Sequence, residues 1–339
     1  MSAATMKDIA RVTGLSLATI SKHLNGGKVL EENQAKIEKA IEELDFRINE
    51  FARGLKTNKT KTIGLLIPDI TTFFYNTVAQ RAELTLRQRG YSTLVYDSLN
   101  ASKTERDALE FLINRRVDGI LALTIDEDGG FLAEADKHQI PVVLIDRSLE
   151  HYTADSVCLD NYNSFYNAIE YLIVNGHEHI GLIVTPMQGN ISTLVIQAYT
   201  DALKRYGLPV LPEYIYENPE LLMKTGYKGT KHFLEMQTPP TAIINSSSEL
   251  TLGSFVAISE LRKSIPEDIS FVGLDLLDLD QISPVKLTHI FPPVDDMVDL
   301  AIDVLLSRIS GSGKHNITQR LEFKCEFRKG DSVADISNK

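Results

Sequence analysis

The residues with the clearest chemical arrangement lie near the N-terminus, between positions 5 and 25. Ala10, Gly14 and Ile20 have the spacing of a helix-turn-helix, in which two helices cross at a small side chain and the turn favours glycine. The second helix of such a motif presents its first side chains to base edges in the major groove of DNA. This spacing therefore predicts a DNA-binding module.

The side chains expected to face the bases are Leu17 and Ala18, followed by Lys22 one turn further along. Leu17 and Ala18 form no hydrogen bonds, so base readout through them depends on contacts with thymine methyl groups. Lys22 offers a point charge rather than the bidentate fork of arginine. Ile20 and Leu24 are expected to point back into the small core of the module.

Other chemistry is not indicated. The run GSGK at 311–314 lacks the spacing, the hydroxyl residue and the preceding strand of a phosphate loop. His177 and His179 are separated by two positions, which would not place both rings on one helical face. Neither a G-x-S-x-G elbow nor a G-x-G-x-x-G loop is present. We therefore expect no catalytic residues, no metal ligands and no cofactor.

Three short helices are expected to position the N-terminal residues, at about 6–12, 16–25 and 32–44. Thr5 and Asp8 form a capping-box pattern at the start of the first helix, and Gly14 ends it. In the third helix, apolar residues recur at helical spacing, so one face is expected to be buried. These residues are Ile37, Ala40, Ile41 and Leu44.

From residue 61 onward, apolar runs such as TIGLLIPDI and DGILALTI alternate with longer amphipathic stretches. Continuous apolar strands that alternate with helices predict parallel sheets covered on both faces. Two such series predict an α/β core of two doubly wound subdomains, with a ligand cleft at the carboxyl ends of the strands.

Composition and charge agree with a globular protein of this kind. Hydrophobic residues make up 43% of the 339, no apolar run approaches the roughly 20 residues of a membrane span, and the N-terminus is not a secretory signal. Cys158 and Cys325 are expected to be small buried hydrophobes, and a cytoplasmic location follows. Net charge is −11, yet residues 1–61 hold 11 Lys and Arg against 8 Asp and Glu. This asymmetry would orient the basic end toward DNA.

Residues 5–55 (TMKDIARVTGLSLATISKHLNG…EENQAKIEKAIEELDFRINEFARGL) resemble the DNA-binding end of the lactose/galactose-repressor family of bacterial transcriptional regulators. The resemblance continues in order along nearly the whole chain. It passes through PDITTFF (68–74), RRVDGILAL (115–123), PVVLIDR (141–147), GHEHIGLI (176–183), PEDISFVGLD (266–275) and LTHI (287–290).

The resemblance implies the roles of further N-terminal residues. Short hydroxyl and amide side chains would anchor DNA phosphates. They are Thr5, Ser16, Thr19, Ser21 and Asn25. At Lys22 the family more often carries arginine, which leaves the operator sequence open.

Residues 49–60 resemble a hinge helix and linker of the family, which folds on DNA beside its twin from a second subunit. Asn49 can cap this helix, Ala52 and Arg53 belong to the matching ARGL motif, and Leu55 would wedge between base steps in the minor groove. The alternative is that Leu55 is a linker residue packed on the core.

The resemblance also implies an organisation of the chain. Residues 1–48 would be the DNA-binding domain, and 61–330 an effector-binding and dimerisation core of periplasmic-binding-protein type I fold. The N-subdomain would comprise about 61–160 and 290–320, and the C-subdomain about 161–289 and 321–330. The end, 331–339, is expected to be a flexible tail.

The core of the family binds sugars, and motif matches imply candidate effector residues here. Phe73 and Phe74 could stack on a sugar face. A bound sugar also needs polar side chains, because every buried hydroxyl must have a hydrogen-bonding partner. The hydrogen-bonding set would be Asp97, Arg147, Asn161 and Asp275.

Several positions depart from the sugar-binding pattern. Ser248 and Glu249 replace an Asn-Asp pair, Leu276 replaces an aspartate, Phe291 replaces a glutamine, and 192–199 lacks an arginine. Three interpretations stay open: another small molecule such as a sugar acid or phosphosugar, a protein co-regulator, or a constitutive repressor.

These observations together predict a homodimeric repressor that binds a near-palindromic operator and responds to a carbohydrate-like effector. The alternative is a cytoplasmic sugar-binding or sugar-modifying protein that has the same core and no role on DNA.

Overall fold

The computed structural model describes residues 4–24, 26–46, 59–149, 151–185, 190–219, 222–274, 285–311 and 317–337. The chain divides into two compact units, Met1–Thr60 and Lys61–Lys339. In these ranges, no helix combines the length and the apolar character that crossing a membrane would require.

The first unit contains the three expected helices, α1 (Met6–Thr13), α2 (Leu17–Leu24) and α3 (Glu31–Glu43). They pack around a small core of Ile9, Ile20, Ile37 and Ala40, all buried. Gly14 ends α1 in the left-handed conformation (φ +69°), and its N–H donates to the carbonyl of Ala10 at 2.9 Å. The helix-turn-helix prediction is therefore confirmed, with the buried face of α3 as expected.

The N-terminal half of the second unit is a parallel sheet in the order β11-β5-β4-β3-β1-β2. Its strands are β1 (Thr62–Ile67), β2 (Ser92–Asp97), β3 (Gly119–Ala122), β4 (Val142–Asp146), β5 (Asp155–Leu159) and β11 (Arg320–Phe323). Its helices are α5 (Phe73–Gln88), α6 (Ser102–Asn114), α7 (Ala133–Lys137) and α12 (Val294–Ser310), with the short 3-10 turn η1 (Gly130–Leu132).

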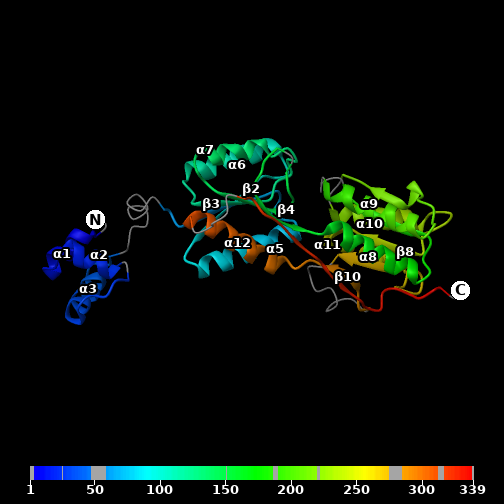
Figure 1. Cartoon of the computed structure of the whole chain (residues 1–339). Helices are drawn as coiled ribbons and strands as arrows, with labels where there is room; N and C mark the ends of the chain where they lie inside the picture. Colours follow the sequence, from blue (N-terminus) through cyan, green and yellow to red (C-terminus); the bar gives the residue numbers. More distant parts are fainter. Residues whose placement is uncertain are drawn as a thin grey trace. The chain divides into compact units, whose positions relative to one another are not determined.

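The C-terminal half is a second sheet in the order β12-β10-β9-β8-β6-β7, parallel except for the edge pair β10 and β12. Its strands are β6 (Ile180–Val184), β7 (Ile215–Glu217), β8 (Ala242–Asn245), β9 (Ser270–Leu274), β10 (Thr288–Phe291) and β12 (Glu326–Arg328). Its helices are α8 (Asn161–Val174), α9 (Asn190–Arg205), α10 (Leu222–Leu234) and α11 (Ser248–Glu260), with the 3-10 turn η3 (Pro212–Tyr214). The predicted pair of doubly wound subdomains is confirmed (Figure 1).

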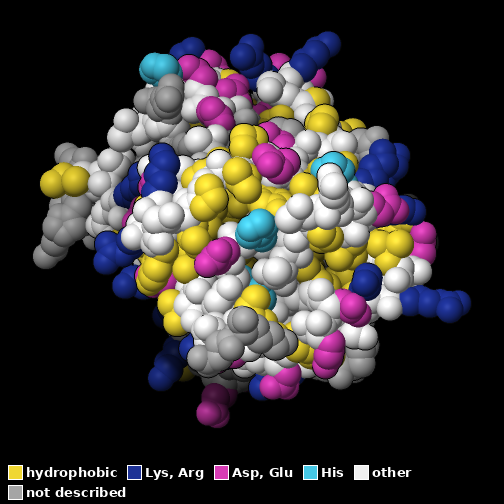
Figure 2. Space-filling model, turned by 90° about the vertical axis from the view of Figure 1, so that its right-hand side faces the viewer, with side chains coloured by type: hydrophobic (Ala, Val, Ile, Leu, Met, Phe, Trp, Pro, Cys, Tyr) yellow, Lys and Arg dark blue, Asp and Glu magenta, His cyan; other side chains and the backbone are white. Residues whose placement is uncertain are grey.

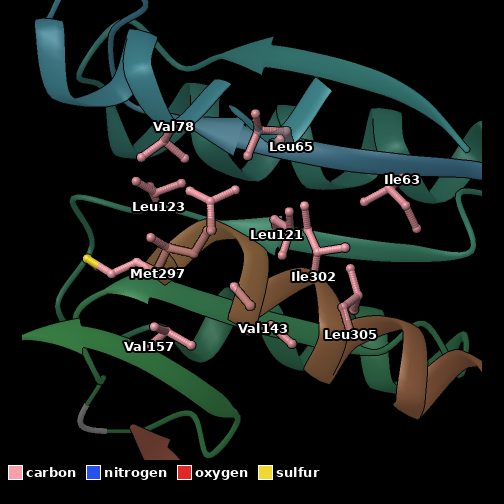
Figure 3. Packing of buried hydrophobic residues seen from close by; sticks show 14 of the residues in the cluster. Ile63, Leu65, Val78, Leu121, Leu123, Val143, Val157, Met297, Ile302 and Leu305 are labelled. Atoms are coloured by element: carbon pink, nitrogen blue, oxygen red, sulfur yellow. The ribbon is translucent and has the colours of Figure 1, made fainter. Parts of the chain in front are cut away.

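Helices cover both faces of each sheet, as continuous apolar strands require. In the N-terminal sheet, α5 and α12 cover one face through a cluster that includes Leu65, Val78, Leu121 and Ile302, all fully buried. Figure 3 shows these side chains pointing toward one another from the strands and the two helices. A second cluster lies beneath α6 and α7 on the opposite face.

The chain passes between the two subdomains three times, and two of the passages differ from the expected boundaries. Thr288–Phe291 belongs to the C-terminal sheet, although 290–320 was assigned to the N-subdomain. Arg320–Phe323 pairs with β5 in the N-terminal sheet, although 321–330 was assigned to the C-subdomain. β11 is a short, half-buried strand at the edge of its sheet, and β10 is buried but only four residues long, so the apolar pattern of neither strand shows which sheet it joins.

The expectation of a flexible tail is wrong for residues 331–337, which pack on the C-terminal subdomain. Ser332 is 1% exposed, accepts the N–H of Thr288 at 2.8 Å and donates to the carbonyl of Phe271 at 2.6 Å. The carbonyl of Ala334 lies 3.1 Å from Nε2 of His177. The sequence predicted disorder for these polar residues because the residues that they contact lie far away in the chain and no local pattern shows them.

Candidate functional site

The outer face of α2 is formed by the three residues expected to meet base edges. Leu17, Ala18 and Lys22 are exposed, and Leu17 leaves 45% of its surface open. Ile20, on the other side of the helix, is completely buried. An exposed apolar residue at the start of a helix suits contact with another apolar group, such as the thymine methyl in a major groove.

The N-terminus of α2 is capped by a hydroxyl. Oγ of Ser16 accepts the backbone N–H of Thr19 at 3.1 Å, and the two side-chain hydroxyl oxygens lie 2.9 Å apart. A cap of this kind satisfies only one of the four free N–H groups at a helix start. The remaining N–H groups and the helix dipole favour an anion such as a DNA phosphate.

Thr5, at the start of α1, is already engaged within the protein. Its backbone N–H and its hydroxyl both donate to the carboxylate of Asp8, at 3.0 and 2.8 Å. These hydrogen bonds, with a smaller contribution from the Arg11 guanidinium, lower the pKa of Asp8. Because a phosphate oxygen only accepts, a phosphate contact at Thr5 requires its hydroxyl to turn away from Asp8.

Among the described residues of the helix-turn-helix unit, lysines that form an ion pair and lysines that do not lie on different elements. On α3, Lys36 pairs with Glu32 at 2.5 Å and Lys39 with Glu43 at 3.7 Å. The exposed residues Lys7, Lys22 and Lys28 form no ion pair with any described residue. Within residues 4–24 and 26–46, the unpaired charge therefore lies on α1, α2 and the turn that follows. Ser21 is half-buried, while Asn25, Asn49, Ala52, Arg53 and Leu55 fall outside the described residues.

One face of the C-terminal subdomain has a different surface. On the face in Figure 2, lysine and arginine side chains lie mainly at the periphery, among acidic and hydrophobic groups. They do not form the continuous basic patch that the electrostatic footprint of a nucleic-acid-binding surface requires.

The second candidate site is a cavity of about 320 Å³ between the two subdomains. It lies at the carboxyl ends of the strands, where ligands bind in open α/β sheets. Its lining from the first subdomain comprises Asp69, Thr71, Thr72, Phe74, Tyr75, Asn100, Asp146 and Leu159. Asn161, Ile191, Leu222, Met223, Ser246, Ser247, Ser248, Glu249, Leu274 and Pro292 complete it.

Two polar side chains of this lining are buried and have no hydrogen-bonding partner among the described residues. Asp146, the last residue of β4, is 8% exposed, and Asn161, the first residue of α8, is 7% exposed. Neither side chain makes a hydrogen bond with any residue that the structure describes. Buried polar groups are almost always paired, so these two are candidates to pair with a molecule in the cavity.

The backbone and the electrostatics of Asp146 are both unusual. Its φ is +78°, a conformation that is costly for a residue with a side chain and that occurs preferentially at functional sites. Burial raises the pKa of Asp146, and the adjacent Arg147 guanidinium opposes that shift. Burial and the nearby Asp146 carboxylate also raise the pKa of the Tyr75 hydroxyl, while burial raises the pKa of Cys158 to about 11.

Glu249 connects the two walls of the cavity. Ser247 caps α11 by accepting the N–H of Leu250 at 3.2 Å. The carboxylate of Glu249 is therefore not needed as the cap of its own helix and can extend to the other subdomain. Oε1 of Glu249 accepts the backbone N–H of Phe73 at 2.7 Å. Since Phe73 is the first residue of α5, a side chain of one subdomain caps a helix of the other.

Comparison with known proteins assigns both units. Residues 5–49 match the family "Bacterial regulatory proteins, lacI family", and residues 60–305 match "Periplasmic binding proteins and sugar binding domain of LacI family". The chain belongs to the LacI family. It is a DNA-binding transcriptional regulator, and the resemblance found in the sequence is confirmed.

Relatives of this LacI-family protein include characterised repressors. The HTH-type transcriptional repressor CytR of Escherichia coli (strain K12) is 30% identical over 310 residues, 91% of each chain. The ribose operon repressor of the same strain is 31% identical over 91% of this chain and 93% of its own. These relatives are transcriptional regulators, not enzymes.

Solved structures support the fold. A LacI family transcriptional regulator from Enterococcus faecium, solved with bound ribose, is 26% identical, with a TM-score of 0.72 over 81% of this chain and 99% of its own. The lac repressor dimer bound to operator and the anti-inducer ONPF has a TM-score of 0.87 at 21% identity, covering 98% of this chain and 100% of its own.

The cavity of this LacI-family protein includes only some of the candidate effector residues. Phe74, Asn161, Ser248 and Glu249 line it. Phe73 contributes its backbone N–H to Glu249 and not a lining side chain. Asp275, with the neighbouring Leu276, falls outside the described residues.

Three further candidates have other contacts. The carboxylate of Asp97 accepts the N–H groups of Ile70 and Leu99, at 3.1 and 2.9 Å, and so holds the loops beside the cavity. The guanidinium of Arg328 lies over the ring of Phe291, with its Cζ atom 3.6 Å from the ring centroid. Arg147 follows Asp146 without lining the cavity.

The lining also includes residues that were not predicted from the sequence, among them Asp69, Tyr75, Asn100 and Asp146. A usable signal was present for two of them, because Asp69 and Asp146 are the first charged residues at the carboxyl ends of apolar strands. That rule marks the ligand edge of a parallel sheet without any family knowledge. Tyr75 had no such signal, because an aromatic residue on a helix resembles ordinary core.

No group of three or more metal-binding side chains occurs within the described ranges. The two histidines near β6 have separate structural contacts instead. Nδ1 of His177 lies 2.9 Å from Oγ1 of Thr241, and Nδ1 of His179 lies 2.7 Å from the hydroxyl of Tyr214.

Proposed function

We propose that this protein is a cytoplasmic repressor that binds a near-palindromic operator as a homodimer and is controlled by a small carbohydrate-like effector. Two α2 helices would enter major grooves one helical turn, about 34 Å, apart. The observation that carries the effector part is a pair of buried polar side chains, Asp146 and Asn161, which line the cavity between the subdomains and make no hydrogen bond with any described residue.

The character of the cavity supports this assignment. Its volume is at the lower end of the range for small-ligand sites, which suits a molecule of monosaccharide size. Phe74, Tyr75 and Met223 supply apolar surface, while Asn100 and Asn161 supply amides that both donate and accept. The ribose-bound relative from Enterococcus faecium makes sugars the first compounds to test.

The test measures operator binding by fluorescence anisotropy, with labelled fragments from upstream of the protein's own gene cluster. Free sugars, amino sugars, sugar acids and phosphosugars are then added singly. We expect one class to change the operator affinity and to raise the melting temperature. Asn161→Leu, which replaces the amide by an apolar group of similar size, should remove both responses and leave effector-free operator binding intact.

The dimer is tested by light scattering with and without the operator. Two chains on each operator duplex are expected. A single chain bound to each duplex at micromolar protein would contradict the dimer. Operator binding that no compound of these four classes alters would contradict the carbohydrate-like effector.

A further inference from the structure

The charged side chains in the described lining of the cavity are all acidic. Its described lining contains three carboxylates, those of Asp69, Asp146 and Glu249, and no lysine, arginine or histidine. Segments 220–221 and 275–284 directly adjoin lining residues in the sequence, segment 186–189 ends two positions before Ile191, and none of the three contains lysine, arginine or histidine. The charged residues in these segments are all acids.

The three carboxylates are not equally available. Asp69 accepts the N–H and the hydroxyl of Thr71, at 2.9 and 2.6 Å, and the amide of Asn100 at 3.2 Å. Glu249 uses one oxygen on the N–H of Phe73. Asp146 accepts no hydrogen bond from any described residue, although it is the most deeply buried of the three.

An ionised carboxylate in this position is costly unless a cation or several donors satisfy it. The raised pKa of Asp146 reflects that cost. Arg147, the nearest cation in the sequence, opposes this rise without lining the cavity. A positive charge delivered by the ligand would offset the burial of Asp146 directly.

We propose that the effector carries a protonated amine that pairs with Asp146, so that its chemical class is an amino sugar or a similar hydroxylated primary amine. This inference rests on the proposed function and narrows it. A hydroxyl and an ammonium can each donate a charge-assisted hydrogen bond to an ionised carboxylate, but only the ammonium also neutralises the buried charge, so the amine adds affinity that a neutral sugar lacks. Asn161 and Tyr75 lie in the same lining and can bind the hydroxyl groups.

The same charge pattern disfavours sugar acids and phosphosugars, which the sequence had left open. A carboxylate or phosphate on the ligand would face three acids in a partly desolvated site, where like charges repel strongly. A ligand anion would need an arginine or lysine partner, and none is in the described lining.

The experiment titrates the full-length protein by calorimetry with matched series built on one sugar skeleton each. The first is glucosamine, glucose and gluconate, followed by the galactose and mannose counterparts. In the series that binds, we expect the amine to bind about 10- to 100-fold more tightly than the neutral sugar, as a charge-assisted pair predicts. The acid should show no measurable binding.

Asp146→Asn removes the charge and keeps the shape. It should lower amine affinity about 10-fold or more and leave neutral-sugar affinity nearly unchanged. Asp107→Asn is the matched control, because Asp107 is exposed on α6 and makes no contact with the cavity. Should Asp146→Asn fail to fold, Asn161→Asp, which adds a carboxylate to the lining, should strengthen the preference for the amine.

The outcomes separate the two proposals. A neutral sugar or an acid that binds more tightly than its amine would overturn the charge inference and leave the carbohydrate effector standing. An amine preference that survives in Asp146→Asn would also overturn it, because Asp146 would then not be the partner. If no member of any series binds or alters operator affinity, the carbohydrate effector fails and the inference fails with it.

Discussion

Glu249 and Phe73 connect the two subdomains across the cavity: Oε1 of Glu249 accepts the backbone N–H of Phe73 at 2.7 Å. The N-cap residue of α5, Thr72, makes no side-chain cap of its own, so the distant carboxylate satisfies an N–H that would otherwise be free. Glu249 also lines the cavity. The same side chain therefore belongs to the cavity wall and joins the two subdomains.

Glu249→Ala should lower the free energy of unfolding of the core by about 1 kcal/mol, the usual cost of losing an N-terminal cap. Urea denaturation followed by circular dichroism measures it. Glu110→Ala is the control, because Glu110 is an exposed helical acid without a described partner and should change stability by less than about 0.5 kcal/mol. Equal effects of the two substitutions would show that the bond to Phe73 contributes nothing.

Lys22→Ala should weaken operator binding. If Lys22 meets a base edge, the loss is about 1–3 kcal/mol per half-site, and discrimination against random DNA falls with it. Lys39→Ala removes the same charge from α3, where Lys39 is already paired with Glu43, and should have a much smaller effect. Anisotropy titrations on operator and random duplexes distinguish a base contact from a phosphate contact, since the latter weakens both duplexes alike.

Leu55→Ala tests the minor-groove wedge. The substitution removes no charge, so the dependence of affinity on salt should hardly change. The loss should be greatest on operators whose central step kinks easily, because the wedge offsets unstacking there. The measurement compares operators that differ only at the central step. An equal loss on every DNA, or none on the operator, would leave Leu55 as a linker residue.

Ser332→Ala should destabilise the C-terminal subdomain by about 1–3 kcal/mol, because the N–H of Thr288 would lose its acceptor in a buried site. Ser102→Ala is the control at an exposed serine with no described side-chain partner. Thermal unfolding of both variants distinguishes a packed C-terminal segment from a tail. Unchanged stability in Ser332→Ala would count against the packing of residues 331–337.

His177 should make stability depend on pH in a defined direction. Burial lowers its pKa in the folded state below the ordinary value of 6.5, so between those two values the unfolded chain binds more protons. Stability from this residue is therefore complete above about pH 6.5 and is lost as pH falls toward the folded pKa. His177→Gln should flatten this part of the urea-midpoint profile relative to wild type. His138→Gln, at an exposed histidine, should leave it unchanged.

Much of the fold could be predicted from local patterns. The spacing of Ala10, Gly14 and Ile20 predicts two crossed helices. Only a small side chain such as that of Ala10 fits where the helices cross, and the turn after α1 requires a residue that adopts the left-handed conformation, as Gly14 does. Apolar runs such as that of β1 predict strands buried on both faces, because helices must cover both sides of a parallel sheet. These features depend on neighbours within a few residues.

The sequence by itself determined the DNA-binding module, the two doubly wound subdomains and the edge of the sheets at which the cavity lies. Only the tertiary structure decided which polar groups meet there. Asp146 and Asn161 have no hydrogen-bonding partner in the part of the chain that the structure describes, and one oxygen of Glu249 binds the N–H of Phe73, because residues far apart in the chain converge at strand ends. The same reason applies to Ser332, whose partners Phe271 and Thr288 lie on strands that no local pattern places beside it.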